Sequence, residues 1–85
     1  MKVFMYTIQD ELGIHARPAG LLVKEVAKFT SEVTISNGTK EANARKIMSI
    51  MMLGIKQGQE ITVTINGEDE EGAAAAVEQF LKENL

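Results

Sequence analysis

Alternation of hydrophobic and polar residues predicts the strands of this 85-residue chain. The clearest is 60–66, where isoleucine and valine alternate with threonine, so that one face of the strand is apolar. Residues 2–8 are rich in β-branched and aromatic types and predict a strand whose two faces are both partly apolar. The Asn-Gly dipeptide at 37–38 is favoured in two-residue hairpin turns, so the flanking segments 32–36 and 39–43 predict a β-hairpin.

Helical periodicity predicts three helices in the remaining segments. In 16–28, apolar residues recur at the spacing of one buried face, and Pro18 fits the first turn, where its missing N–H costs nothing. The segment 46–53 predicts a short helix that ends at Gly54. The segment 70–84 predicts the last helix, because apolar residues mark one face and acidic residues lead at the positive end of the helix dipole.

The predicted order of elements is β-α-β-β-α-β-α. Two strands joined by a tight hairpin do not fit a doubly wound parallel sheet, whereas an antiparallel sheet with its helices on one face accommodates them. We therefore expect an α+β fold in two layers, a four-stranded antiparallel sheet covered on one face by three helices. A chain of this length forms one domain, over residues 1–85.

Composition narrows the classes of function. The chain has no cysteine and a single histidine, which excludes disulfides, thiolate sites and multi-histidine metal sites, so we expect no cofactor and no metal. A net charge of -3, with only one tyrosine and three phenylalanines, argues against a nucleic-acid partner. Because the apolar runs are too short for a signal peptide or a membrane span, we expect no membrane partner and a cytoplasmic location.

The single histidine, His15, stands immediately before the proline-marked start of the first predicted helix. The first N–H groups of a helix have no acceptor within it and the helix dipole is positive there, so an anion beside His15 would meet the N–H groups of Ala16 and Arg17. Pro18 has no N–H, which concentrates donation on those two residues. Arg17 adds a permanent charge and a planar fork of donors that matches phosphate oxygens. This pattern predicts a phosphate site around a nucleophilic ring, with Gly13 allowing close approach of the backbone.

Taken alone, a histidine at a helix start is more often only a cap or a surface residue. The full segment 13–19, Gly-Ile-His-Ala-Arg-Pro-Ala, makes the phosphate-site interpretation much stronger. The segment resembles the active site of the HPr family, the histidine-containing phosphocarriers of the bacterial phosphotransferase system. Segments 49–54 and 67–70 resemble the second motif and the last turn of that family. The resemblance extends from end to end and implies an open-faced β-sandwich, in agreement with the two layers expected above.

The resemblance also implies a reaction. His15 would accept phosphate on Nδ1 from phospho-enzyme I, which is charged by phosphoenolpyruvate, and would donate it to the IIA domains of sugar permeases. Arg17 would hold the phosphoryl group. The chain would then be a carrier with a phosphohistidine intermediate and not an enzyme in its own right, and its small size favours a monomer.

The short predicted helix carries more hydrophobic residues than so small a core can bury. At helical spacing Ile47, Ile50 and one residue of 53–54 form a buried face, which leaves the methionines nearer the surface. Methionine often fills gaps in cores, but exposed methionines suit a surface that must fit several partners, and in the family this helix docks both donor and acceptor. The residues assigned to partner docking are Gly20, Lys24, Ile47, Met48, Met51 and Met52, with Arg45 and Lys46 as further cations at the rim of this apolar surface.

Position 46 departs from the family pattern. Many relatives, especially in Gram-positive bacteria, have a serine there that a regulatory kinase phosphorylates, and this chain has Lys46. Lysine cannot accept that modification, and its charge opposes any mimicry of phosphoserine. Ser49 lies one turn further on and does not match the family position. We therefore expect no regulatory serine.

A second departure leaves the pathway open. Many sugar-type carriers have a small polar residue where this chain has Leu12, and Leu12 together with the segment 41–43 is more like the nitrogen-related branch of the family. The main hypothesis is a carrier for sugar uptake, and the alternatives are a nitrogen-type regulatory carrier and a regulator that only binds other proteins. Such a regulator would not need the nucleophile that the chain retains in His15.

Overall fold

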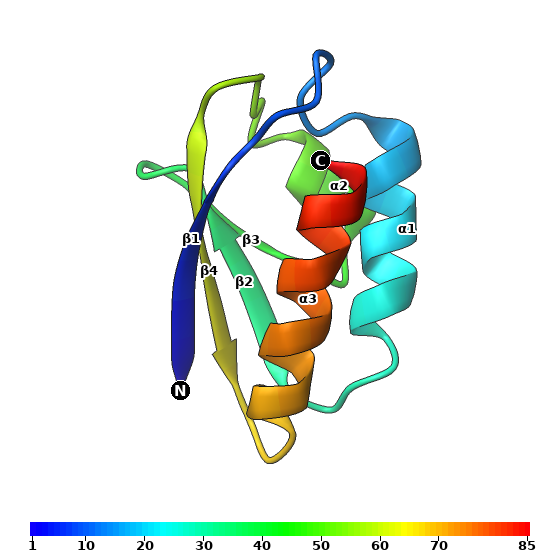
Figure 1. Cartoon of the computed structure of the whole chain (residues 1–85), viewed down its shortest axis with the longest axis vertical. Helices are drawn as coiled ribbons and strands as arrows, with labels where there is room; N and C mark the ends of the chain where they lie inside the picture. The colour runs from blue at the N-terminus through cyan, green and yellow to red at the C-terminus, as the bar shows by residue number, and fades with distance from the viewer.

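The computed structural model describes residues 1–85 and contains four strands and three helices in the predicted order (Figure 1). The sheet is antiparallel throughout, with the strand order β1-β4-β2-β3, and the helices lie together on one of its faces. The two-layer α+β fold is thereby confirmed. The strands are β1 (Lys2–Thr7), β2 (Glu32–Ser36), β3 (Glu41–Asn43) and β4 (Glu60–Asn66), and the helices are α1 (Ala16–Val26), α2 (Ile47–Met51) and α3 (Glu70–Asn84).

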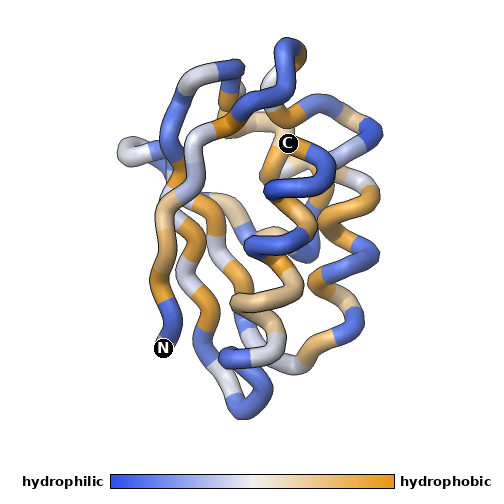
Figure 2. The backbone as a smooth tube through the Cα atoms, in the orientation of Figure 1, coloured by the Kyte–Doolittle hydropathy of each residue, from blue (hydrophilic) through white to orange (hydrophobic).

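The core lies between the sheet and the helices. Ile61, Val63 and Ile65 of β4 are fully buried, and the register sets Ile65 beside Val33 and Val63 beside Ile35 on β2. The alternation of these residues with threonines is visible along the strands in Figure 2. Because side chains of a strand point alternately to its two faces, the hydrophobic set covers the inner face and the threonines remain on the open one.

The helices bury the faces that their periodicity predicts. The residues buried from α1 are Pro18, Ala19, Leu22 and Val26, and those buried from α3 are Ala73, Val77, Phe80 and Leu81. α1 packs against both α2 and α3 and so occupies the middle of the helical layer. Its N-terminal end, with the residues just before it, is therefore bordered by the end of α3 and by the loop that follows β1 (Figure 1).

The turn between β2 and β3 differs from the predicted Asn-Gly turn by one residue. The side-chain Oδ1 of Asn37 accepts hydrogen bonds from the N–H groups of Thr39, at 2.9 Å, and Lys40, at 2.8 Å, and the Asn37 N–H donates to the Lys40 carbonyl at 3.1 Å. Asn37 therefore precedes the turn, and Gly38 and Thr39 are its central residues. β3 begins correspondingly later than predicted.

Asp69, just before α3, bonds to a segment outside its own helix. It makes no side-chain hydrogen bond to its own helix. Its carboxylate instead accepts the Thr30 N–H at 2.8 Å, the Ser31 N–H at 2.9 Å and the Ser31 hydroxyl. The hydroxyl first, and then these N–H groups, lower the pKa of Asp69 from 3.8 to about 2. The carboxylate thereby fastens the loop after α1 to the start of α3.

Replacing Asp69 by asparagine is expected to lower the stability at neutral pH and to flatten its acid dependence. A carboxylate with a lowered pKa stabilises the fold above its unfolded pKa and loses that contribution as the pH falls through its folded pKa. For Asp69 this window runs from about 3.8 down to about 2. Urea unfolding from about pH 7 to about pH 2 measures the effect. Glu68→Gln, at an exposed carboxylate, is the control, and equal acid slopes for wild type and Asp69→Asn would contradict the assignment.

Candidate active site

His15 occupies the residue position immediately before α1, with an extended backbone (φ -111°, ψ -178°). Its side chain makes no capping hydrogen bond, so the ring is not used to close the helix. The first hydrogen bond of the helix runs from the Ala19 N–H to the His15 carbonyl, at 3.0 Å. The N–H groups of Ala16 and Arg17 therefore have no acceptor within the helix, and Pro18 has none to donate. These free donors lie where the sequence predicts them.

The loop before His15 is held tightly against the chain that follows α2. Gly13 has φ +68°, and a Cβ on this residue would overlap the Ile55 carbonyl oxygen and lie 2.7 Å from the Lys56 Cα. The Ile14 N–H donates to the same Ile55 carbonyl at 3.1 Å. The close approach expected at Gly13 is therefore made to Ile55 and Lys56, and it fixes where His15 begins the helix.

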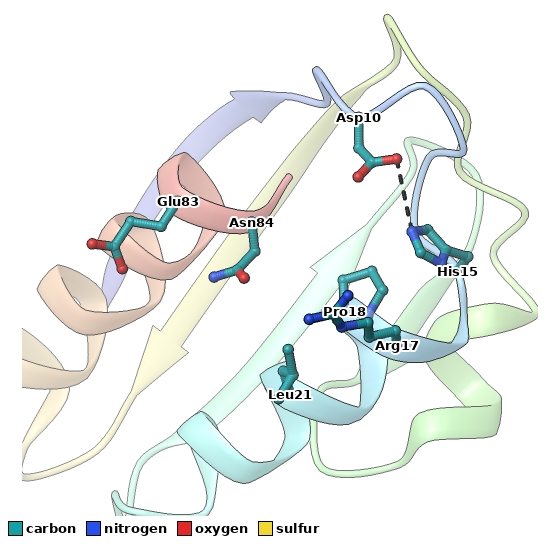
Figure 3. A pocket seen from close by; sticks show the side chains of 7 residues that line it. All are labelled: Asp10, His15, Arg17, Pro18, Leu21, Glu83 and Asn84. Carbon is teal, nitrogen blue, oxygen red and sulfur yellow. Dashed lines mark ion pairs between the residues drawn. The ribbon is translucent and has the colours of Figure 1, made fainter.

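His15 faces an open hollow of about 220 Å³ between the start of α1 and the end of α3 (Figure 3). Pockets for small molecules usually have volumes of about 300–1,000 Å³, so this hollow is smaller than a typical one. Its lining is mostly polar, as a site for a small charged group would be. The lining residues are Asp10, His15, Arg17, Pro18, Leu21, Glu83 and Asn84.

Asp10 is one of the lining residues that the sequence did not predict, and it lies beside the histidine. Its Oδ1 lies 3.7 Å from His15 Nε2, and the two side chains are 29% and 35% exposed (Figure 3). The same oxygen accepts the Leu12 N–H at 2.8 Å, and the Asp10 carbonyl accepts the Gly13 N–H at 2.9 Å. The local signal was the aspartate three residues before a glycine, which is typical of a turn and here brings residue 10 back to the histidine.

Arg17 is exposed and borders the same hollow. None of the four ion pairs in the structure involves Arg17, although Asp10 and Glu83 also border the hollow. The guanidinium is therefore uncommitted. It is a permanent cation with several free donors on the first turn of the helix, next to the free N–H groups of that turn.

α2 presents the hydrophobic residues expected of a docking surface. Met48 and Met52 are 64% and 76% exposed, whereas Met51 is half-buried and packs on the core. The buried face holds Ile50 and Leu53 as predicted, but the prediction that it includes Ile47 is wrong, because Ile47 is 37% exposed. Ile47 instead lies beside the neighbouring helix α1, over Gly20.

The Ile47 side chain extends over Gly20 of α1, and its Cδ1 would lie 3.5 Å from a Cβ built on that glycine. Leu21, the next residue, is partly exposed and lines the hollow beside His15. We call the exposed hydrophobic residues around this end of the molecule the apolar surface; they are Leu12, Leu21, Ile47, Met48 and Met52. Leu12 and Leu21 were not predicted to belong to it.

The predicted cations divide into two groups. Lys24 and Lys46 are exposed and make no ion pair. Arg45 instead donates to the carbonyls of Phe29, at 2.6 Å, and Ser31, at 3.1 Å. Its guanidinium thus ties the start of α2 to the loop after α1, so Arg45 is less free than the two lysines to reach a partner.

The remaining features of the chain concern metals and membranes. No group of three or more histidine, cysteine, aspartate or glutamate side chains is arranged to hold a metal ion. None of the three helices combines the length and the hydropathy that crossing a bilayer requires.

Comparison with known proteins places the chain in a family. The family model described as "PTS HPr component phosphorylation site" matches residues 3–83. The phosphocarrier protein HPr of Mycoplasma capricolum is 43% identical over 81 residues, which cover 95% of this chain and 91% of that protein.

Two solved structures agree. A histidine-containing phosphocarrier protein from Mycoplasma superposes with a TM-score of 0.93 at 40% identity, covering 96% of this chain and 93% of that one. An HPr dimer from Thermoanaerobacter tengcongensis superposes with a TM-score of 0.77 at 37% identity, covering 98% and 95%. The chain therefore belongs to the HPr family of bacterial phosphocarriers of the phosphotransferase system.

Proposed function

We propose that this protein carries a phosphoryl group on His15, accepting it from phospho-enzyme I and passing it to the IIA domain of a sugar permease. The observation that carries the proposal is the conjunction of three features at the start of α1: the imidazole of His15, the free first N–H groups of the helix, and the unpaired guanidinium of Arg17, with His15 and Arg17 both lining one open hollow. Family membership supports the same chemistry.

The transfer needs alignment and charge stabilisation more than it needs a general base. A lone pair of the ring attacks phosphorus, and the bond to the donor breaks with its electron pair returning to the donor. Arg17 and the helix N–H groups face the charge that spreads over the transferred oxygens. The hollow is open, so the phosphoryl group remains within reach of the second partner.

The two partners dock on the apolar surface in this proposal. Exposed methionines adapt to differently shaped partners, and the apolar surface adjoins the hollow through Leu21. Lys24 and Lys46 then attract acidic groups on the partners. We propose a monomeric carrier, because each partner must reach the open hollow in turn; the dimer of the Thermoanaerobacter relative is a property of that protein.

Control through a regulatory serine is not part of the proposal. Lys46 is exposed at the start of α2 and carries a charge opposite to that of phosphoserine. Leu12 and the segment 41–43 resemble the nitrogen-related branch of the family. This resemblance affects only the identity of the acceptor IIA domain, because the chemistry of His15 is the same in both branches.

Incubation with phosphoenolpyruvate and enzyme I tests the function. The protein is expected to gain one phosphate that is labile in acid and stable in base, and then to lose it to a IIA domain. His15→Ala, checked for folding by circular dichroism, is expected to gain none. Equal labelling of His15→Ala, or no labelling of the wild type, would overturn the proposal. A phosphate that survives acid would indicate a serine ester and contradict the absence of serine control.

A further inference from the structure

Asp10 is held in place independently of His15. Its N–H donates to the Leu85 carbonyl at 2.9 Å, its carbonyl accepts from Gly13, and its Oδ1 accepts from Leu12. These three hydrogen bonds fix the backbone and one carboxylate oxygen of a residue on the loop between β1 and α1. The side chain is thus preorganised, and the charge it carries is directed at one atom, His15 Nε2.

The charges around the imidazole are unevenly arranged. The charged groups that line the hollow are Asp10, Arg17 and Glu83, and among the two acids only Asp10 lies within ion-pair distance of the ring. In Figure 3 Asp10 approaches the imidazole from above, where the dashed line reaches Nε2, whereas Arg17 and Pro18 lie below the ring. A carboxylate accepts hydrogen bonds and cannot donate them when ionised, so it favours a proton on the nitrogen it faces.

In a neutral imidazole one nitrogen carries the proton and the other carries the free lone pair. We infer that Asp10 is a positioning residue that holds the proton of His15 on Nε2 and thereby presents Nδ1 as the nucleophile. The inference deepens the proposed function and rests on it. The separation of 3.7 Å is longer than a direct hydrogen bond, and it shortens when the ring becomes cationic, since contacts of catalytic groups are often long before the reactants bind.

The reaction balances without a base. The Nδ1 lone pair forms the bond to phosphorus, the bond from phosphorus to the donor breaks, and its electron pair returns to the donor. The proton stays on Nε2, so the product is a phosphoimidazolium whose positive ring faces Asp10. The carboxylate thus stabilises the charge that the ring gains on transfer, and the same charge is lost when the group moves on to the acceptor.

Asp10→Asn separates the charge of Asp10 from its role in the turn. Asparagine keeps Oδ1 for the Leu12 N–H, and that oxygen is also the atom that faces Nε2, so the substitution leaves the turn in place and removes only the negative charge that favours a proton on Nε2. With ¹⁵N-labelled histidine, the nitrogen chemical shifts of unphosphorylated His15 report the two tautomers. The ratio of Nε2–H to Nδ1–H is expected to fall about fivefold or more, and phosphoryl acceptance from phospho-enzyme I about tenfold.

Glu11→Gln is the matched control, because it removes an exposed carboxylate from the same loop and should change neither quantity. An unchanged tautomer ratio in Asp10→Asn would overturn the inference. So would normal transfer by Asp10→Asn together with slow transfer by Asp10→Ala, since that result assigns Asp10 to the turn alone. The tautomer is measured without phosphorylation, so failure of this inference is distinguishable from failure of the His15 carrier function.

Discussion

Gly13→Ala is expected to destabilise the protein by about 3 kcal/mol. Two effects add at this position. Alanine in the left-handed conformation costs about 1 kcal/mol, and the new methyl group overlaps the Ile55 carbonyl oxygen and comes within 2.7 Å of the Lys56 Cα. Both of those atoms are backbone and cannot turn aside as a flexible side chain would, so relief requires movement of the whole loop, at about 1–3 kcal/mol. Urea unfolding at neutral pH measures the loss.

Gly54→Ala is the matched control for this variant. Gly54 has nearly the same backbone angle, φ +62°, and a Cβ there would meet nothing within 4 Å. It is therefore expected to cost only the backbone part, about 1 kcal/mol. If the two variants lose equal stability, the close approach of Gly13 to Ile55 contributes nothing. Because Gly13 also donates to the Asp10 carbonyl, its displacement should disturb the pairing of Asp10 with His15 as well.

The layers of the fold could be predicted because the periodicities of the sequence coincide with burial. Ile61, Val63 and Ile65 alternate with threonine, and each one is fully buried against the helices. The start of the helix at Ala16 could also be predicted, because proline is compatible with the first turn of a helix and with few other helical positions, and Pro18 lies in that turn. These signals are local, and the tertiary structure did not override them.

The hairpin register shows where local signals compete. An Asn-Gly pair favours a tight turn with asparagine as its first central residue, but asparagine before a turn can also accept backbone N–H groups through its side chain. The bonds from Thr39 and Lys40 to Asn37 show that the second preference prevails. Both preferences have a sound physical basis, and the sequence contains nothing that ranks them.

The parts of the site that were missed depend on contacts between distant segments. Asp10 reaches His15 because its backbone is bound to Leu85, at the end of α3, and Glu83 enters the hollow from the same helix. Arg45 was assigned to the docking rim because a cation beside an apolar helix usually lies in solvent, whereas the loop after α1 brings two carbonyls within its reach. Contacts of this kind join residues far apart in the sequence, so no local spacing pattern predicts them.

Arg17→Ala is expected to slow phosphoryl acceptance from phospho-enzyme I roughly 100-fold while leaving stability within about 0.5 kcal/mol of the wild type. The guanidinium takes part in no ion pair within the chain, so its removal disrupts no structure. It also leaves the helix N–H groups in place, which is why some transfer should persist. Rapid-quench measurement of phosphate on His15, beside urea unfolding of the same preparation, separates the two effects.

Two further variants define what Arg17 contributes. Lys82→Ala removes an exposed cation from the last turn of α3 and should leave the rate unchanged, which controls for net charge. Arg17→Lys keeps a cation on the first turn but loses the planar fork, so its rate should lie between those of Arg17→Ala and the wild type. A wild-type rate in Arg17→Ala would leave only the helix N–H groups to stabilise the transferred charge. A rate in Arg17→Lys as low as in Arg17→Ala would show that the geometry of the donors, and not the charge alone, governs the transfer.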